Sequence, residues 1–153
     1  MANQAQTAGL NTPLDWRLLA EDDLSVAEYL AANMRPIPTQ HVAFNCQQAA
    51  EKYLKGALTV LGIEPPYTHD LILLNNLSEK LRPSYVAIFA SCTIVTQFSV
   101  QPRYDRGLSL SDNDMLLVLA HTKIIRDFLQ KEIPELFKND EAEEDKNIPK
   151  TVI

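Results

Sequence analysis

The chain has 153 residues, of which 46% are hydrophobic and 22% charged, and its net charge at pH 7 is −6. This length and composition are typical of one globular domain with a single core. The acidic balance argues against general DNA binding, which needs a basic surface. No apolar run approaches the roughly 20 residues of a membrane span, and the first residues lack the basic start and apolar core of a signal peptide. We therefore expect a cytoplasmic protein that does not bind membranes.

The first two predicted helices follow from apolar side chains spaced about 3.6 residues apart. Pro13 suits the first turn of a helix over 15–33, and Pro36 ends it because proline lacks the amide proton. The most regular apolar stripe covers 39–61. Gly62 then fits the left-handed residue that often ends a helix.

Three more helices are predicted, over 70–81, 83–99 and 111–137, with an irregular loop at 100–110. Pro134 is expected to kink or end the last of them. The predicted fold class is all-α, an antiparallel bundle of about five helices joined mostly by short loops.

Three regions of different composition divide the chain. Residues 1–12 are small and polar and predict a loose leader, and residues 13–138 form the predicted bundle. Residues 139–153 contain five acidic and two basic side chains, which predicts an acidic C-terminal tail. The tail is either a solvated end or a docking peptide that uses the apolar Val152 and Ile153.

The second predicted helix carries a polar stripe with alternating steps of four and three residues. The stripe is either a solvent face or the wall of a cleft, in which Lys52 and Lys55 would bind phosphate. Glu51 and Lys55 are also spaced for an ordinary pair within one helix. The stripe consists of His41, Asn45, Gln48, Lys52, Lys55 and Thr59.

Two loop segments carry further candidate binding residues. Thr68 is a possible helix cap ahead of Asp70, and His69 between them could meet an anion or carry a proton. In the late loop, Arg103 offers bidentate phosphate contacts and Tyr104 a ring that can stack on a base. The alternative for Arg103 is a bond to helix carbonyls or to a carboxylate.

Metal and cofactor chemistry finds no support in the sequence. The histidines His41, His69 and His121 are widely separated, and no phosphate-binding glycine loop or paired-cysteine motif occurs. Cys46 and Cys92 lie on apolar helix stripes, which is typical of buried, unreactive cysteines. We expect no metal, no cofactor and no disulfide.

Four sequence segments together resemble HEPN domains (higher eukaryotes and prokaryotes nucleotide-binding). They are Asp-Trp at 15–16 with Ala-Glu-Asp-Asp-Leu at 20–24, Gln-Gln-Ala-Ala-Glu-Lys-Tyr-Leu-Lys at 47–55, Thr-His-Asp-Leu at 68–71 and Arg-Tyr at 103–104. The resemblance covers roughly residues 14–135.

The resemblance implies a bundle similar to the substrate-binding subunits of nucleotidyltransferases, commonly dimeric. It also implies a nucleotide-binding module without catalysis of its own, the partner of a minimal nucleotidyltransferase in a toxin–antitoxin or defence-type system. We expect the ligand-binding residues to converge on one groove; they are Lys52, Lys55, His69, Arg103 and Tyr104.

Two alternatives remain, a metal-independent RNase toxin and a dimeric interaction module that binds no nucleotide. The RNase branch of the family uses an arginine followed, after four to six residues, by a histidine late in the fold. Arg103 and Arg106 have no such histidine. Arg35 and His41 match the spacing, but they lie in the first connection between helices with two prolines between them. We therefore predict no catalytic residues.

Overall fold

A computed structural model describes residues 10–99 and 110–138 of the chain. Within these ranges the chain forms five α-helices and two short 3-10 helices, and no strand. In chain order they are α2 (Pro13–Asn33), α3 (Thr39–Val60), α4 (Leu71–Leu81), η1 (Pro83–Ile88), α5 (Phe89–Ser99), α6 (Asp112–Glu132) and η3 (Pro134–Leu136). The prediction of an all-α bundle is confirmed.

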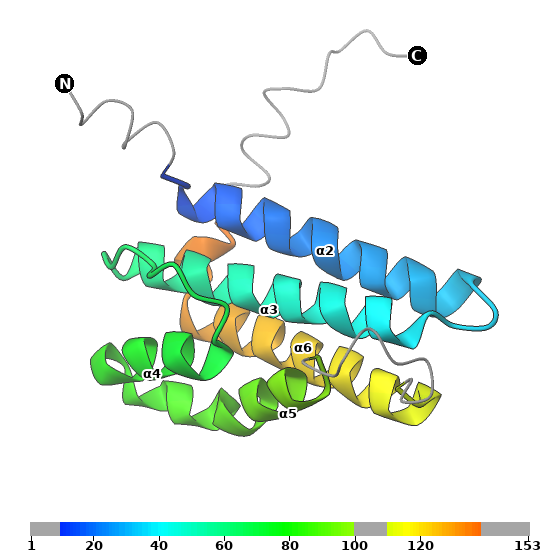
Figure 1. Cartoon of the computed structure of the whole chain (residues 1–153). Coiled ribbons are helices and arrows are strands. Elements are labelled where there is room, and N and C mark those ends of the chain that lie inside the picture. Colours follow the sequence, from blue (N-terminus) through cyan, green and yellow to red (C-terminus); the bar gives the residue numbers. More distant parts are fainter. Residues whose placement is uncertain (1–9, 100–109, 139–153) are drawn as a thin grey trace, which may run out of the picture.

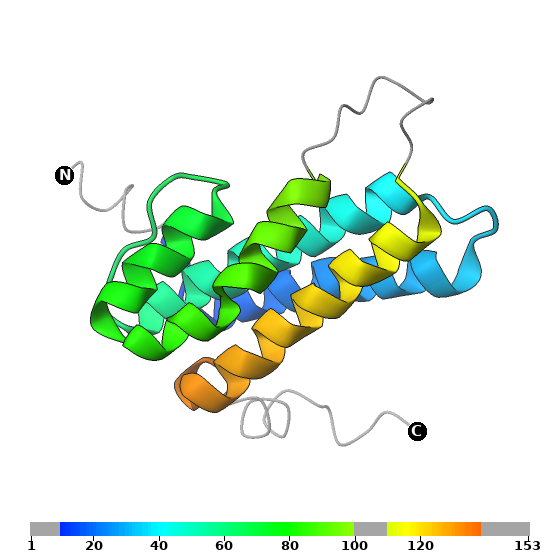
Figure 2. The same cartoon turned by 90° about the horizontal axis from the view of Figure 1, so that it is seen from below.

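The long helix α3 forms the centre of the bundle and touches each of the other α-helices. Figure 1 shows α2 lying along one side of α3, while α4 and α5 lie on the opposite side. Seen from below, α5 and α6 cross in front of α3, and α2 lies behind it (Figure 2). This position explains why 13 of the 22 residues of α3 are buried.

Local sequence signals determine where α2 begins and where α3 ends. The Thr12 side chain accepts a hydrogen bond from the Asp15 N–H at 3.1 Å, and the Asp15 carboxylate accepts one from the Thr12 N–H at 2.9 Å. This reciprocal cap starts α2 at Pro13, two residues earlier than predicted. At the end of α3, Gly62 has φ +82°, and the Ile63 N–H donates to the Leu58 carbonyl at 2.9 Å. The predicted left-handed helix end is confirmed.

A glycine lets α3 approach its neighbours closely. A Cβ atom added at Gly56 would lie 2.8 Å from Leu136 Cδ1 and 3.0 Å from Trp16 Cβ. Both distances are shorter than normal contacts, so a side chain here would press on α2 and η3, and glycine permits their close packing against α3.

The single helix predicted over 83–99 is wrong in its first half, which is the 3-10 helix η1. The buried Asn75 side chain donates to the Tyr85 carbonyl at 3.1 Å. In an α-helix that carbonyl would accept from the Phe89 N–H, which donates to the Val86 carbonyl instead. Similarly, α6 ends at Glu132 rather than 137, because Pro134 begins the short helix η3.

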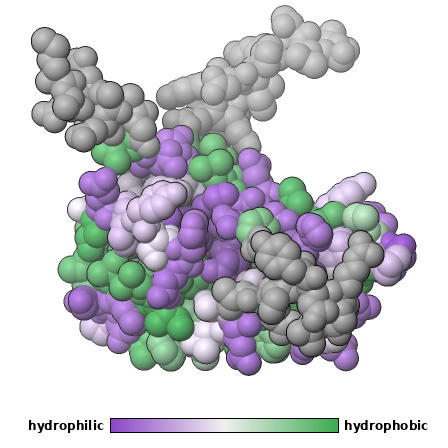
Figure 3. Space-filling view, viewed as in Figure 1, coloured by the Kyte–Doolittle hydropathy of each residue, from purple (hydrophilic) through white to green (hydrophobic). Residues whose placement is uncertain are grey.

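The outer surface is mixed. On the face seen in Figure 3, hydrophilic residues run across the middle, and patches of hydrophobic residues appear toward the margin where α4 lies. In the described part of the chain, none of the helices combines the length and apolar character that crossing a bilayer requires.

Candidate functional site

The larger of two hollows described here opens between α3, the start of α4 and the end of α5. Its volume is about 640 Å³, within the range of small-molecule sites. We call it the α3–α5 pocket. It is lined by Phe44, Gln47, Gln48, His69, Asp70, Ile72, Thr96 and Ser99.

Two polar atoms of the α3–α5 pocket are buried without a hydrogen-bond partner among the described residues. They are the side-chain oxygen Oε1 of Gln47 and the hydroxyl oxygen of Thr96. The other end of the Gln47 amide donates to the His69 carbonyl at 3.0 Å. A buried polar atom without a partner costs about 1–3 kcal/mol, and one explanation for such an atom is a missing water or ligand.

The start of α4 forms part of the pocket rim, and its cap differs from the prediction. Asp70, not Thr68, is the N-cap: its carboxylate accepts from the Ile72 and Leu73 N–H groups at 3.0 and 3.1 Å. The Thr68 hydroxyl instead accepts from the Asp70 N–H at 3.1 Å. Because the Asp70 carboxylate already binds two of the free amides of α4 and carries a negative charge itself, this helix start is a poor place for a second anion.

A buried carboxylate joins two of the predicted site residues. Glu51 accepts from the Lys55 ammonium at 3.2 Å through Oε2, and its Oε1 lies 2.7 Å from His69 Nδ1. Lys55 also lies 5.5 Å from the centre of the Trp16 ring, close enough for a cation–π contact. The side chains of Glu51 and Lys55 are only 5% and 8% exposed, whereas that of His69 is 72% exposed. Glu51 thus holds one edge of an open histidine ring at the pocket.

Of the remaining predicted site residues, the structure describes only Lys52. Lys52 forms an ion pair with Asp23 of α2 and does not line the α3–α5 pocket. The Glu51–Lys55 spacing does form the ordinary helix pair that the sequence suggested. Arg103 and Tyr104 fall outside the described residues. The structure therefore brings Lys55 and His69 together through one carboxylate and engages both lysines with acids.

The polar stripe of α3 fits neither predicted description over its whole length. His41 is exposed, Gln48 lines the α3–α5 pocket, and Lys55 is buried beside Trp16. One stripe therefore passes through three environments, because different neighbours cover successive turns of the helix.

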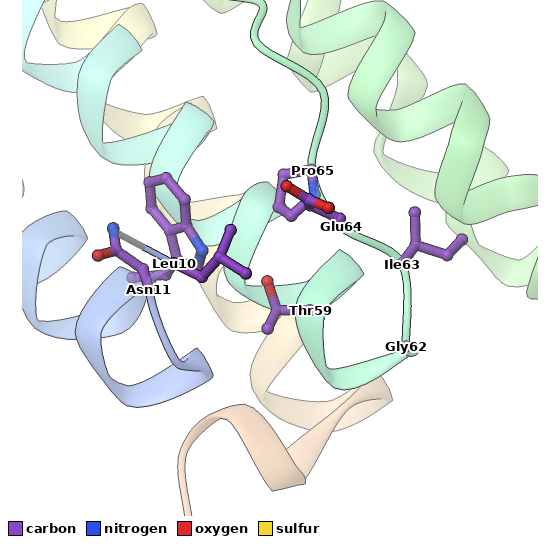
Figure 4. A pocket seen from close by; sticks show the side chains of 8 residues that line it. Leu10, Asn11, Thr59, Gly62, Ile63, Glu64 and Pro65 are labelled. Atoms are coloured by element: carbon purple, nitrogen blue, oxygen red, sulfur yellow. The ribbon is translucent and has the colours of Figure 1, made fainter. Parts of the chain in front are cut away.

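The second hollow, of about 350 Å³, lies where the start of α2 meets the end of α3. Figure 4 shows Leu10, Thr59 and Pro65 around it, coming from the segment before α2, the last turn of α3 and the connection after it. The Thr59 hydroxyl donates to the Lys55 carbonyl at 2.9 Å and is therefore satisfied within its helix. This hollow contains none of the predicted site residues.

The arginine and histidine with RNase-like spacing have separate local surroundings. The Arg35 guanidinium donates to the carbonyls of Ala31 and Met34, at 3.0 and 2.7 Å, and so closes the end of α2. His41 lies exposed in the first turn of α3. Within 10–99 and 110–138, no three histidine, cysteine or acidic side chains gather in a way that would hold a metal ion.

Both cysteines are buried, as predicted. Burial raises the pKa of the Cys46 thiol from 9.0 to about 12, against a smaller opposing effect from a hydrogen bond with Thr122. Burial also raises the pKa of Cys92 to about 12. Both thiols stay protonated near neutral pH, so neither is a nucleophile.

Sequence reasoning missed the most informative atoms of the pocket. Gln47 was part of a recognised motif, but nothing marked its amide oxygen as unpartnered. Thr96 lies on a predicted helix without any motif, and it becomes notable only because α5 packs beside α3.

Comparison with known proteins places this fold. The sequence profile of the HEPN domain matches residues 14–133. The crystal structure of an archaeal HEPN homologue superposes with a TM-score of 0.65 at 23% identity, covering 81% of this chain and 99% of that one. A comparison with curated proteins finds no match. The profile match spans most of the chain, and the chain therefore belongs to the HEPN domain family.

Proposed function

We propose that this protein is a nucleotide-binding helical module without catalysis of its own, and that its ligand binds in the α3–α5 pocket. The observation that carries the proposal is the pair of unpartnered buried atoms, Gln47 Oε1 and Thr96 Oγ1, in a hollow of about 640 Å³. Membership of the HEPN family supports the ligand class, because the resemblance implies nucleotide binding.

The described lining fits a base better than a phosphate. It contains no lysine or arginine, and it includes the Asp70 carboxylate. His69, open at the rim, is the described residue best suited to meet a phosphate. Lys55 acts indirectly in this proposal, since it neutralises the Glu51 carboxylate that holds His69. Lys52 would reach a ligand only by leaving Asp23.

Arg103 and Tyr104 are included in the proposal on the basis of the sequence. They follow Ser99, a pocket residue, by four and five positions. We propose phosphate contact for Arg103 and stacking for Tyr104.

The partner protein is proposed from the family resemblance alone. A helical module of this kind would serve as the nucleotide-binding half beside a minimal nucleotidyltransferase, in a toxin–antitoxin or defence-type system. Fold likeness by itself does not assign that role, so nucleotide binding is the step to test first.

A thermal-shift titration of the full chain with ATP, GTP, CTP and UTP tests the proposal. A ligand that binds only the folded state stabilises it by about 2.7 kcal/mol at a hundredfold excess over Kd, which raises the melting temperature by several degrees for a domain of this size. We expect a saturable rise with at least one nucleotide, weakened in His69→Ala and Arg103→Ala. Lys131→Ala, which removes an exposed cation of α6, is the control that should leave the rise unchanged. No rise at millimolar nucleotide would contradict the proposal.

A second candidate function, a dimeric interaction module, is favoured by apolar side chains left exposed on η1, α5 and α6. On α6 they recur at helical spacing, as an uncovered stripe would. HEPN domains are commonly dimeric, and a symmetric pair is the usual arrangement. We propose that this face joins two copies. Dimeric mass in sedimentation, together with no nucleotide shift, would favour this function over the first. The exposed residues are Val86, Phe89, Leu116, Leu117 and Ile124.

A further inference from the structure

The Gln47 side chain has only one orientation that its surroundings allow. Its Nε2 donates to the His69 carbonyl at 3.0 Å. Turning the amide over would place its oxygen against that carbonyl oxygen, and two acceptors repel each other. The buried Oε1 therefore remains directed away from His69, and it can only accept a hydrogen bond.

Thr96, on α5, adds a second kind of hydrogen-bonding group to the same pocket. Its hydroxyl is buried without a partner in the described part of the chain, and a hydroxyl can both donate and accept. Gln47 thus offers an acceptor and Thr96 a donor in one pocket, which complements a ligand edge that carries both an N–H donor and an acceptor. A phosphate carries acceptors alone, so it would leave Gln47 Oε1 unsatisfied.

Positive charge near the pocket is already used. Lys55 is bonded to Glu51, Lys52 is bonded to Asp23, and the Ile72 and Leu73 amides of α4 are bonded to Asp70. The described pocket therefore offers neutral hydrogen-bonding groups rather than a cationic cradle.

We infer that the α3–α5 pocket binds the base of a nucleotide by its hydrogen-bonding edge, with a base N–H donating to Gln47 Oε1 and the Thr96 hydroxyl bonding the neighbouring ring atom. This inference rests on the proposed nucleotide binding and adds which part of the ligand enters the pocket. Gln47 is the specificity-determining residue, because it accepts only from a base that keeps its N–H.

Three nucleosides that differ in the methylation of one amine distinguish the loss of a hydrogen bond from steric exclusion. Adenosine has two N–H bonds on its exocyclic amine, N6-methyladenosine has one, and N6,N6-dimethyladenosine has none. We expect calorimetric titration of the full chain to give similar affinities for the first two and at least about tenfold weaker binding of the third, since the last leaves a buried acceptor unpaired. Uridine and N3-methyluridine give the same test for a pyrimidine.

A matched pair of variants on α5 provides the control. Thr96→Val keeps the side-chain shape and removes the pocket hydroxyl, and we expect it to weaken binding of the preferred nucleoside roughly fivefold to tenfold. Thr93→Val removes a hydroxyl that donates to the Phe89 carbonyl outside the pocket, and it should leave the affinity unchanged.

The outcomes separate the two proposals. If N6,N6-dimethyladenosine binds as well as adenosine, or if Thr96→Val binds like Thr93→Val, the base-edge inference is overturned while nucleotide binding stands. If neither nucleosides nor their triphosphates bind at millimolar concentration, the proposed function itself falls.

Discussion

The two sides of α3 treat polar groups differently. Toward α2, the ammonium groups of Lys52 and Lys55 each have a carboxylate partner. Toward α5, the neutral groups of Gln47 and Thr96 keep an unpartnered oxygen. A buried charge without a partner costs far more than a buried neutral group without one. At these four residues the paired charges support the fold, and the two unpartnered oxygens are those that line the α3–α5 pocket.

The strongest way to break this comparison is to remove one partner on the charged side. Lys55→Met leaves Glu51 buried without its cation, and we expect the free energy of unfolding to fall by about 3–5 kcal/mol. Urea denaturation measures the change. In the matched variant Lys52→Met, the pair with Asp23 is about one-fifth exposed on each side, so a loss of about 1 kcal/mol is expected.

Equal losses in the two lysine variants would show that Glu51 does not depend on Lys55. A double variant tests whether the stability loss comes from the unpaired charge of Glu51. Adding Glu51→Gln to Lys55→Met removes the stranded charge, so it should recover part of the lost stability.

Burial in the core keeps the thiols of Cys46 and Cys92 neutral, and the dependence of stability on alkaline pH tests this effect. The folded-state pKa values of Cys46 and Cys92 are raised to about 12 from 9.0. Above pH 9 the unfolded thiols lose protons that the folded ones keep, so the folded state binds more protons and stability falls as pH rises. Each thiol contributes a loss of about 1.4 kcal/mol per pH unit between roughly pH 9 and 12.

Urea titrations at pH 8, 9 and 10 measure this slope. The double variant Cys46→Ala and Cys92→Ala starts less stable, but its stability should change little up to pH 10. Above pH 10 a decline should remain in this variant, because burial also raises the pKa of Tyr85 from 10.0 to about 12 and the pKa of Tyr53 well above its usual value. An unchanged slope below pH 10 would assign the effect to other groups.

The smallest expected effect lies on the neutral side of α3. Thr96→Val removes a hydroxyl that no described residue bonds, so the free energy of unfolding should stay constant or rise by up to about 1 kcal/mol. Thermal denaturation without ligand measures it. A loss above 1 kcal/mol would mean that the hydroxyl supports the fold, and the two sides of α3 would then not differ as described.

The fold was predictable because its causes are local. The ends of α2 and α3, ahead of Pro36 and Gly62, follow from backbone chemistry that is visible in the sequence, and the start of α2 differs from the prediction by two residues. The break between η1 and α5 was not predictable, because it depends on Asn75 from another helix bonding the Tyr85 carbonyl. Such a bond exists only once the helices have packed.

The site was less predictable, because a sequence shows which residues are charged but not the contacts between helices that pair them. The position of His69 after two prolines predicted that it precedes a helix start. It does, and that helix start forms part of the pocket rim. The spacing of Glu51 and Lys55 did predict their ion pair, but the Asp23 partner of Lys52 comes from α2 and is not visible in the sequence. The orientation of the Gln47 amide depends on the His69 backbone, which sequence patterns do not reveal.

The close packing at Gly56 links synthesis of the chain to its folding. Trp16 stands near the start of the described chain and Leu136 near its end, and both meet this one residue near the C-terminal end of α3. A ribosome makes the chain from the N-terminus, so α2 and α3 can pair early, but their contact with η3 must wait until Leu136 has left the exit tunnel. The last turn therefore completes the bundle after nearly all of the domain has been translated.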